Sequence, residues 1–263
     1  MDTIKVDLHN HFTTKSRVLD VNRVADRVRE ALGPGGICAL VNYADQRFEA
    51  FANRAGSYGG DRYGNAVHFP DRDVTITKGE EVPTLQGDVL VLGLEEGRHL
   101  TPGRELDYTL CEGRSYGGVN IIPHPCFHSA AWNYLATQRN FECAEDIDAF
   151  EIHNGNVSKR LNGKVGELWL HYMGLSGCGG LASSDGHSFR EVGSSYTEIL
   201  GFNFQDAKTL NDGLRTAVKM VSPGYKKTHS LWGPLVHMGI LGSLMIADKM
   251  WIPVSRGDKE SLR

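Results

Sequence analysis

The chain has 263 residues, of which 40% are hydrophobic and 23% are charged, and its formal net charge is −4. This length suits one large domain with a core of useful size. The charge excludes a broad basic face for duplex nucleic acid, although a short nucleotide substrate stays open. Five cysteines without a C-x-x-C pair indicate reduced thiols in a cytoplasmic protein, and the N-terminus has no secretory signal pattern.

The predicted elements alternate between short apolar runs and helical patterns, which is typical of βα units around a largely parallel sheet. Strands are expected at residues 4–8, 37–41, 74–77, 89–94, 119–122, 148–152 and 180–182. Helices are expected at about 21–32, 48–53, 104–112, 157–172 and 206–220. Asp20 is the predicted N-cap of the first helix, and residues 56–73 are predicted to form a long loop near the active end.

Residue types that bind metals follow five of the predicted strands. They are His9 and His11, then Glu80 and Glu81, then His124, then His153, and finally Asp185 and His187. In a parallel barrel the carboxyl ends of the strands converge on one face, and residues i and i+2 of an extended strand point to the same side. Imidazole and carboxylate suit Zn²⁺, Mn²⁺ or Fe²⁺. One such residue is weak evidence, but the ordered set predicts a divalent-metal site.

The motifs around these residues resemble one known family. The matching segments are Asp7-Leu8-His9-Asn10-His11, Gly79-Glu80-Glu81, Ile122-Pro123-His124-Pro125, Phe150-Glu151-Ile152-His153-Asn154, Ser183-Ser184-Asp185-Gly186-His187 and Gly193-Ser194-Ser195-Tyr196-Thr197-Glu198-Ile199. In this order they are similar to the PHP (polymerase and histidinol phosphatase) phosphoesterases. The resemblance implies a single α/β domain, a distorted TIM-like (βα)₇ barrel, which we place at residues 1–222. The final forty or so residues lie outside the resemblance, and we expect residues 223–263 to form a C-terminal helical extension.

The resemblance also implies a set of metal ligands. One ion would be held by His9, His11, Glu81 and Asp185, a second by Glu81, His124 and His153, and His187 would belong to a third site. Glu81 is preferred to Glu80 because of the family's G-x-E spacing. The family's Thr-Asp-His motif is replaced here by Val41-Asn42-Tyr43, and residues 13–17 lack the usual histidine or acid. We therefore expect two divalent transition metals (zinc, manganese or iron), with a third site absent or weakened.

Three further residues are predicted to contact substrate. Lys15 and Arg17 lie in the loop where the charge of a third ion would be missing, and the planar guanidinium of Arg17 matches phosphate oxygens. Solvated loop charges are an equally good explanation. His128, like His68, is a weaker candidate on a predicted loop.

The function predicted from the motifs is metal-dependent hydrolysis of a phosphate monoester, with a small phosphorylated metabolite or nucleotide as substrate. A metal-bound hydroxide would attack phosphorus, and Asp185 or His187 would manage the proton. Three alternatives stay open: a phosphodiesterase or single-strand 3′–5′ exonuclease, an amidohydrolase-type enzyme, and a non-catalytic binding module that has lost a metal. The apolar stretch from Leu231 to Ile252 contains His237 and glycines, so we expect it to pack on the barrel or on a partner subunit of a homo-oligomer rather than to enter a membrane.

Overall fold

The computed structural model describes residues 2–13, 19–42, 46–126, 131–137, 142–204 and 206–220. The predicted substrate contacts Lys15, Arg17 and His128, and the predicted extension at 223–263, lie outside the described residues. In the described ranges, none of the helices combines the length and apolar character needed to cross a bilayer.

The described chain alternates between strands and helices, much as its sequence predicts. The strands are β1 (Thr3–Asp7), β2 (Gly36–Asn42), β3 (Asp61–Arg62), β4 (Ala66–Phe69), β5 (Val74–Thr84), β6 (Gly87–Leu92), β7 (Val119–Ile122), β8 (Ala149–Asn154), β9 (Gly179–Ser183) and β10 (Thr197–Leu200). The helices are α1 (Val21–Leu32), α2 (Arg47–Ala55), η1 (Gly56–Tyr58), α3 (Leu106–Ser115), α4 (Trp132–Thr137), η2 (Glu142–Asp146), α5 (Lys159–Ser176) and α6 (Ala207–Lys219). The predicted N-cap is confirmed, because the Asp20 side chain accepts a hydrogen bond from the Arg23 amide at 3.0 Å.

The strands form one sheet that nearly closes into a barrel. Its order is β10-β1-β2-β5-β6-β7-β8-β9, and β9 lies beside β1 and β10. The amide of Ala182 on β9 donates to the hydroxyl of Thr197 on β10 at 2.8 Å. Six strands (β1, β2, β5, β7, β8 and β9) run in one direction, whereas β6 and β10 run against their neighbours. The predicted barrel-like α/β fold is confirmed, with a sheet more mixed than expected.

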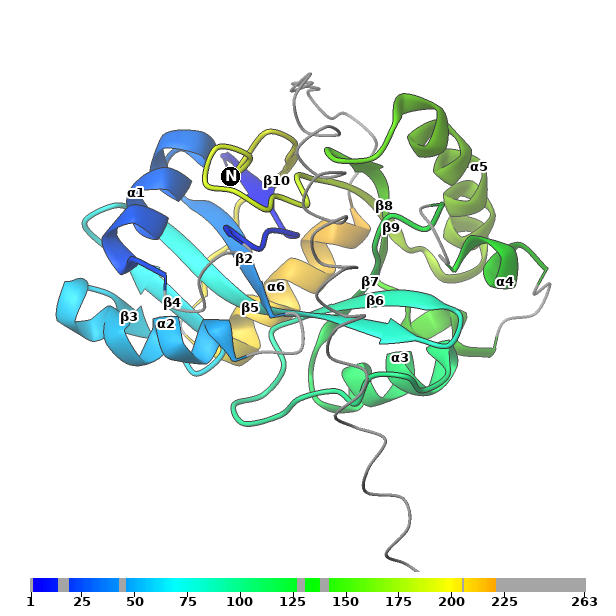
Figure 1. The fold of residues 1–263 in the computed structure, drawn as a ribbon, viewed down its shortest axis with the longest axis horizontal. Coiled ribbons are helices and arrows are strands. Elements are labelled where there is room, and N and C mark those ends of the chain that lie inside the picture. The colour runs from blue at the N-terminus through cyan, green and yellow to red at the C-terminus, as the bar shows by residue number, and fades with distance from the viewer. Residues whose placement is uncertain are drawn as a thin grey trace, which may run out of the picture.

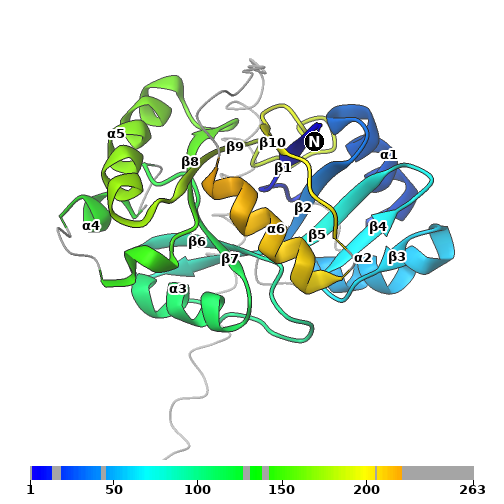
Figure 2. The same ribbon diagram turned by 180° about the vertical axis from the view of Figure 1, so that it is seen from behind.

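Alternation along the strands separates a barrel interior from the faces under the helices. On β2, Ile37, Ala39 and Val41 point into the interior core, and Cys38 and Leu40 pack in the core that includes α1 and α2. Figure 1 shows these two helices on one side of the molecule and α4 and α5 on the opposite side. Figure 2 shows α6 lying across the sheet between them.

The end of the barrel opposite the predicted site is covered by α6. Leu210 and Leu214 belong to the same buried cluster as the interior residues of β1 and β2. Asn211 donates to the carbonyls of Gly93, after β6, and Gly117, before β7. These loops lie where the parallel strands begin, so α6 leaves the carboxyl ends of the strands available for a site.

The prediction for residues 56–73 is wrong. This segment contains η1 and the strands β3 and β4, and it pairs along the first half of β5, where His68 lies opposite Thr75. It therefore lies at the amino end of the parallel strands. His68 accordingly lies away from the predicted site, on a strand rather than a loop, with its ring 3.1 Å from the Thr75 hydroxyl.

Candidate metal centre

The candidate ligands gather at the rim where the parallel strands end. His9 and His11 follow β1, His124 follows β7, Asp185 follows β9, and Glu81 lies within β5. Three groups of side chains there each offer ligand atoms within 4.8 Å of one another: His9 with His11 and Glu81, His9 with His124 and Asp185, and His11 with Asp185 and His187. Because the groups share members, they surround one common space.

Glu81 lies between two sets of histidines. Its Oε2 is 3.6 Å from Nε2 of His9 and 3.2 Å from Nε2 of His11. Its other oxygen, Oε1, is 2.9 Å from Nε2 of His124. The two oxygens of one carboxylate thus face different nitrogen donors, which is the arrangement that a carboxylate bridging two ions requires.

Asp185 reaches the same space from a strained turn. Its φ is 51°, a left-handed conformation that non-glycine residues seldom adopt. Its amide donates to the His9 carbonyl at 2.8 Å, and its Oδ1 lies 3.4 Å from Nε2 of His9 and 3.7 Å from Nε2 of His11. His124 also has a positive φ, 26°. Strained backbone at positions that face one space is a common property of functional sites.

Glu151 on β8 supports this centre, a role that the sequence did not reveal. Its carboxylate accepts from Nδ1 of His9 at 3.1 Å and from the His124 amide at 2.7 Å, as well as from Asn154 and Ser183. Because a carboxylate can only accept, Nδ1 of His9 carries a proton, which makes Nε2 the nitrogen that could bind an ion at the centre. The available clue was an acidic residue between Phe150 and Ile152 in an otherwise apolar strand.

Asp88 is a second residue that the sequence did not reveal. It opens β6, which runs antiparallel to β5, so its strand begins at the rim where the parallel strands end. Its carboxylate lies within 4.8 Å of ligand atoms of Glu81 and His124. Burial, followed by the charge of Glu81, raises the pKa of Asp88 to about 6. The sequence predicts a strand that begins at residue 89, so Asp88 falls before a predicted strand rather than after one.

His153 is buried on β8, next to an irregularity in the pairing of β8 with β9 between Glu151 and His153. Among the described residues, it joins none of the groups whose ligand atoms lie within 4.8 Å of one another. Its part in binding a second ion stays a prediction.

The donor set suits a divalent first-row ion. Nε2 of His9 is buried and, within the described ranges, has no hydrogen-bond partner, which is costly for a polar atom unless an ion faces it. Burial disfavours the charged imidazoles, yet the surrounding carboxylates raise the pKa of His9, and they raise that of His124 to about 9. The centre therefore attracts positive charge, and binding an ion there would release protons.

Asn42 occupies the position at which the PHP family, which the motifs resemble, carries an acid. Its amide nitrogen donates to Glu49 at 3.0 Å, and its carbonyl oxygen accepts from the Phe48 amide at 2.8 Å at the start of α2. Both ends of the side chain are thus used to join β2 to α2. The neighbouring Tyr43 lies outside the described residues.

Glu80 points away from the centre and belongs to a different cluster. Glu49, Glu80 and His99 bring their ligand atoms within 4.8 Å of one another, but the buried Lys78 ammonium lies 2.9 Å from Glu49 and 3.3 Å from Glu80. The lysine supplies the positive charge that an ion would otherwise bring. Of the two adjacent glutamates, only Glu81 faces His9, His11 and His124.

A hollow of about 330 Å³ opens beside Glu81. Its lining combines polar side chains with four apolar ones, namely Asn42, Gln46, Glu80, Glu81, His99, Val82, Pro83, Leu100 and Pro102. This volume is near the lower end of the roughly 300–1,000 Å³ of small-molecule sites. The hollow therefore suits a small group of mixed polar and apolar character next to Glu81.

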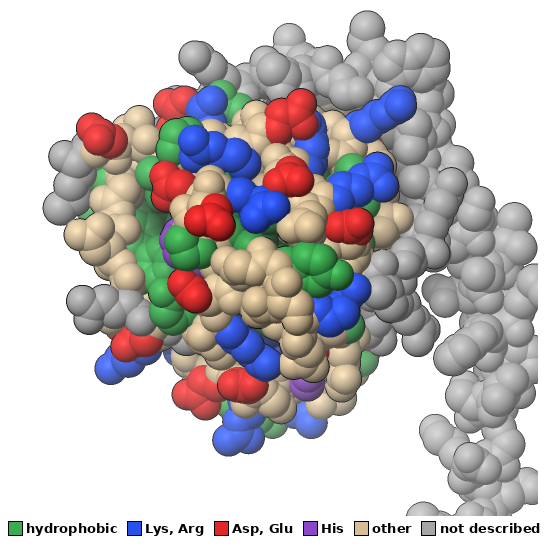
Figure 3. All heavy atoms as spheres, turned by 90° about the vertical axis from the view of Figure 1, so that its left-hand side faces the viewer, with side chains coloured by type: hydrophobic (Ala, Val, Ile, Leu, Met, Phe, Trp, Pro, Cys, Tyr) green, Lys and Arg blue, Asp and Glu red, His purple; other side chains and the backbone are tan. Residues whose placement is uncertain are grey.

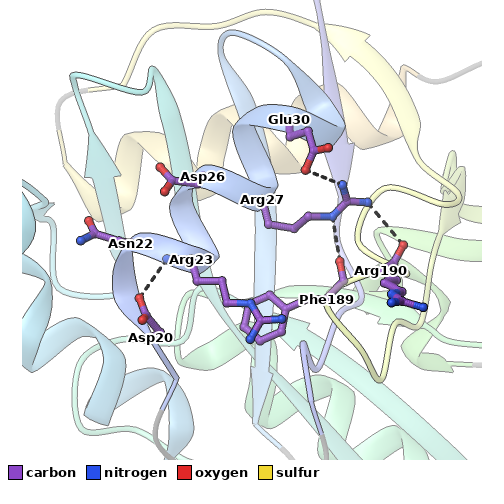
Figure 4. Close-up of a pocket in the computed structure, with 8 residues that line it drawn as sticks. All are labelled: Asp20, Asn22, Arg23, Asp26, Arg27, Glu30, Phe189 and Arg190. Atoms are coloured by element: carbon purple, nitrogen blue, oxygen red, sulfur yellow. Dashed lines mark hydrogen bonds and ion pairs between the residues drawn. The ribbon is translucent and has the colours of Figure 1, made fainter.

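A larger hollow of about 640 Å³ lies between α1 and the loop after His187, apart from the candidate ligands. There the Arg23 guanidinium lies over the Phe189 ring, 4.1 Å from its centroid (Figure 4). A neighbouring hollow of about 420 Å³ joins these two residues to Phe12 and Thr13, which follow His11. On this side of the molecule, acidic and basic side chains are interspersed (Figure 3).

No family model and no curated protein matches the chain, but solved structures do. It resembles PsfC from Pseudomonas syringae PB-5123 with a TM-score of 0.58 and 17% identity, over 94% of this chain and 100% of that one. It also resembles the lesion-specific endonuclease PfuEndoQ from Pyrococcus furiosus, with a TM-score of 0.55 and 13% identity over 86% of this chain.

A third similar structure is a two-domain protein from Bacteroides vulgatus that contains a predicted PHP-like metal-dependent phosphoesterase. Its TM-score is 0.54 and its identity 16%, over 83% of this chain. The matches cover 57% of the endonuclease and 63% of the two-domain protein. At these identities the likeness establishes a shared fold, so the chemistry has to be argued from the centre itself.

Proposed function

We propose that the chain is a metal-dependent phosphomonoesterase that acts on a small phosphorylated metabolite or nucleotide. The observation that carries this proposal is the position of Glu81, whose two oxygens face His9 and His11 on one side and His124 on the other. A bridging carboxylate between nitrogen donors is the framework of a two-metal centre. Such centres catalyse in-line displacement at phosphorus.

The ligands divide between two positions. His9, His11, Asp185 and one oxygen of Glu81 would hold the first ion, and the other oxygen of Glu81 with His124 would hold the second. When bound, the pair would lower the pKa of a water molecule and neutralise the nonbridging phosphoryl oxygens. Glu151 would fix the orientation of His9, as carboxylates commonly do for metal-binding histidines.

His187 is placed to move a proton at the edge of the centre. Its Nδ1 donates to the Asp185 carbonyl at 2.8 Å, and this bond makes Nε2 the basic nitrogen of the ring. Its ring centroid lies 4.6 Å from that of His11. His187 could therefore take a proton from the attacking water or donate one to the leaving alcohol.

The hollow beside Glu81 favours a monoester. Its volume of about 330 Å³ leaves little room for an oligonucleotide, and its mixed polar and apolar lining suits a small leaving group. The leaving group would contact Gln46 and His99 while the phosphoryl group faces the ligands.

A phosphodiesterase or single-strand exonuclease is the second candidate, and the stack of Arg23 on Phe189 favours it. Aromatic rings and arginines on which bases can stack are typical of single-strand binding surfaces. The hollow that contains this pair reaches the segment after His11, so a strand could cross from there to the centre.

The test is a hydrolysis screen with chelator-stripped protein supplemented with Mn²⁺, Zn²⁺ or Fe²⁺. The substrates are p-nitrophenyl phosphate, its bis ester, an aryl amide and a library of phosphorylated metabolites. We expect metal-dependent release of phosphate from monoesters, abolished in His9→Ala and retained in His171→Ala, which removes an exposed histidine of α5.

Other outcomes of the screen identify the alternatives. Faster hydrolysis of the bis ester, with loss in Phe189→Ala, would favour the diesterase. Turnover of the amide alone would overturn the phosphoesterase proposal. Protein that binds no transition metal and remains inactive would indicate a non-catalytic module.

A further inference from the structure

We propose that Asp88 is a ligand of the second ion, in a site that it forms with Glu81 and His124. This inference rests on the proposed two-metal centre and adds a residue of β6 to it. The observation behind it is that ligand atoms of these three side chains lie within 4.8 Å of one another.

The strand register explains how Asp88 reaches the centre. In the β5–β6 pair, Asp88 lies opposite Pro83 and Leu90 lies opposite Glu81. Directly opposed residues of an antiparallel pair face the same side, and alternate residues along a strand share that side. Asp88 and Glu81 therefore both project toward the barrel interior, one diagonal step apart, whereas Val82 and Val89 pack outside against α3 and its neighbours.

Among the described residues, no other contact of Asp88 explains why a carboxylate occupies this position. In the part of the chain that the structure describes, it has no hydrogen bond or salt bridge, although it is only partly exposed. Its carboxylate lies beside the carboxylate of Glu81 and the imidazole of His124. An ion held among these three side chains would offset the repulsion between the two acids.

The site formed by Asp88 would be distinct from that of the first ion. His124 faces Oε1 of Glu81 at 2.9 Å, and His9 and His11 face Oε2. Among the described residues, Asp88 groups with Glu81 and His124 and not with His9 or His11. The second ion would have two carboxylates and one imidazole among its ligands, whereas the first would have two carboxylates and two imidazoles. The second position is therefore the more suitable of the two for Mn²⁺.

The experiment measures metal binding rather than turnover. Chelator-stripped wild-type protein and Asp88→Asn are titrated with Mn²⁺ by isothermal calorimetry, and bound Mn²⁺ is followed by electron paramagnetic resonance. We expect wild-type protein to bind two ions with a spin-coupled spectrum. Asp88→Asn should bind the first ion as before and lose the coupling, with the second ion weakened at least about tenfold.

Two controls separate this role from a structural one. Asp107→Asn changes a partly exposed aspartate of α3 outside the centre and should bind both ions normally. Circular dichroism of metal-free Asp88→Asn should match that of wild type, and Asp88→Ala repeats the test without an amide in the site. His153→Gln is measured in parallel.

The outcomes distinguish this inference from the proposed function. Two ions bound with unchanged affinity in both Asp88 variants would overturn the role of Asp88 and leave the two-metal proposal intact, as would loss of the second ion in His153→Gln alone. Wild-type protein that binds no metal would overturn the proposed function itself.

Discussion

At the scale of single residues, the centre depends on Glu151 as much as on the ligands that contact an ion. This buried carboxylate accepts from His9, the His124 amide, Asn154 and Ser183 at once. It therefore connects β8 to both sets of histidines that face Glu81. If an NH₂ group replaced one carboxylate oxygen of Glu151, this hydrogen-bond donor would face groups that are themselves donors.

We expect Glu151→Gln to lower the affinity for the first ion by about 10- to 100-fold, because a histidine ligand loses the group that orients it. It should also destabilise the protein by about 1–3 kcal/mol, since a buried donor loses its acceptor. Calorimetric titration with Zn²⁺ and urea unfolding would measure the two effects. Glu198→Gln on the exposed face of β10 is the matched control, and wild-type affinity in Glu151→Gln would remove the orienting role.

The sequence could predict those site residues whose order in the chain reflects their place in the fold. His9 and His11, or Asp185 and His187, follow strands that run in one direction, so their convergence follows from the parallel arrangement. Asp88 lies at the start of its strand and reaches the rim only because β6 runs antiparallel to β5. Glu151 lies inside a strand, where an acid gives no sign of its partners until neighbouring strands are placed.

At the scale of elements, β5 shows where a hydrophobic pattern ends before its strand does. The apolar alternation stops near Thr77, and the sequence therefore predicts a strand of four residues, yet β5 runs for 11, from Val74 to Thr84. It continues because the outward Lys78 and Glu80 are buried by pairing with Glu49 and His99. Such compensation depends on α2 and the segment after β6, and no local pattern records it.

The contact between α5 and α4 leads to a prediction for alkaline pH. The Tyr172 hydroxyl donates to the Leu135 carbonyl at 3.0 Å, and burial raises the pKa of this phenol from 10.0 to about 12. Because the folded pKa exceeds the unfolded one, its stabilising contribution is complete below pH 10 and is lost as the pH rises toward 12.

Tyr172→Phe should therefore cost about 1 kcal/mol at neutral pH through the lost hydrogen bond, and the gap to wild type should narrow above pH 10. Urea unfolding of both proteins across this range measures the gap and cancels the other titrating groups. Tyr108→Phe, on an exposed tyrosine of α3, should show no such narrowing. A gap that stays constant up to pH 12 would contradict burial as the cause.

At the scale of the whole molecule, stability and chemistry occupy opposite ends of the barrel. Apolar side chains fill the interior, α6 covers the end where the parallel strands begin, and the other end holds buried histidines and acids. The alternation of strands and helices predicted βα units and a largely parallel sheet, and the resemblance to the PHP family implied the barrel. The antiparallel strands were not predicted, because the turn at Leu85 and Gln86 joins two strands that the sequence marks only as neighbours.

This division predicts that metal binding stabilises the fold as a whole. The ligands come from β5 and from the segments after β1, β7 and β9. An unfolded chain cannot present them together, so an ion binds almost only to the native state. A hundredfold excess over Kd then adds about 2.7 kcal/mol, which corresponds to a rise in Tm of roughly 5–10 °C for a chain of this size. Differential scanning calorimetry with and without Mn²⁺ or Zn²⁺ measures this rise in Tm.

The rise in Tm should disappear in His9→Ala, persist in His171→Ala and reverse when a chelator is added. An unchanged Tm of wild-type protein at saturating concentrations of every tested ion would mean that these side chains do not bind metal in the native barrel, because selective binding to the native state must raise its stability.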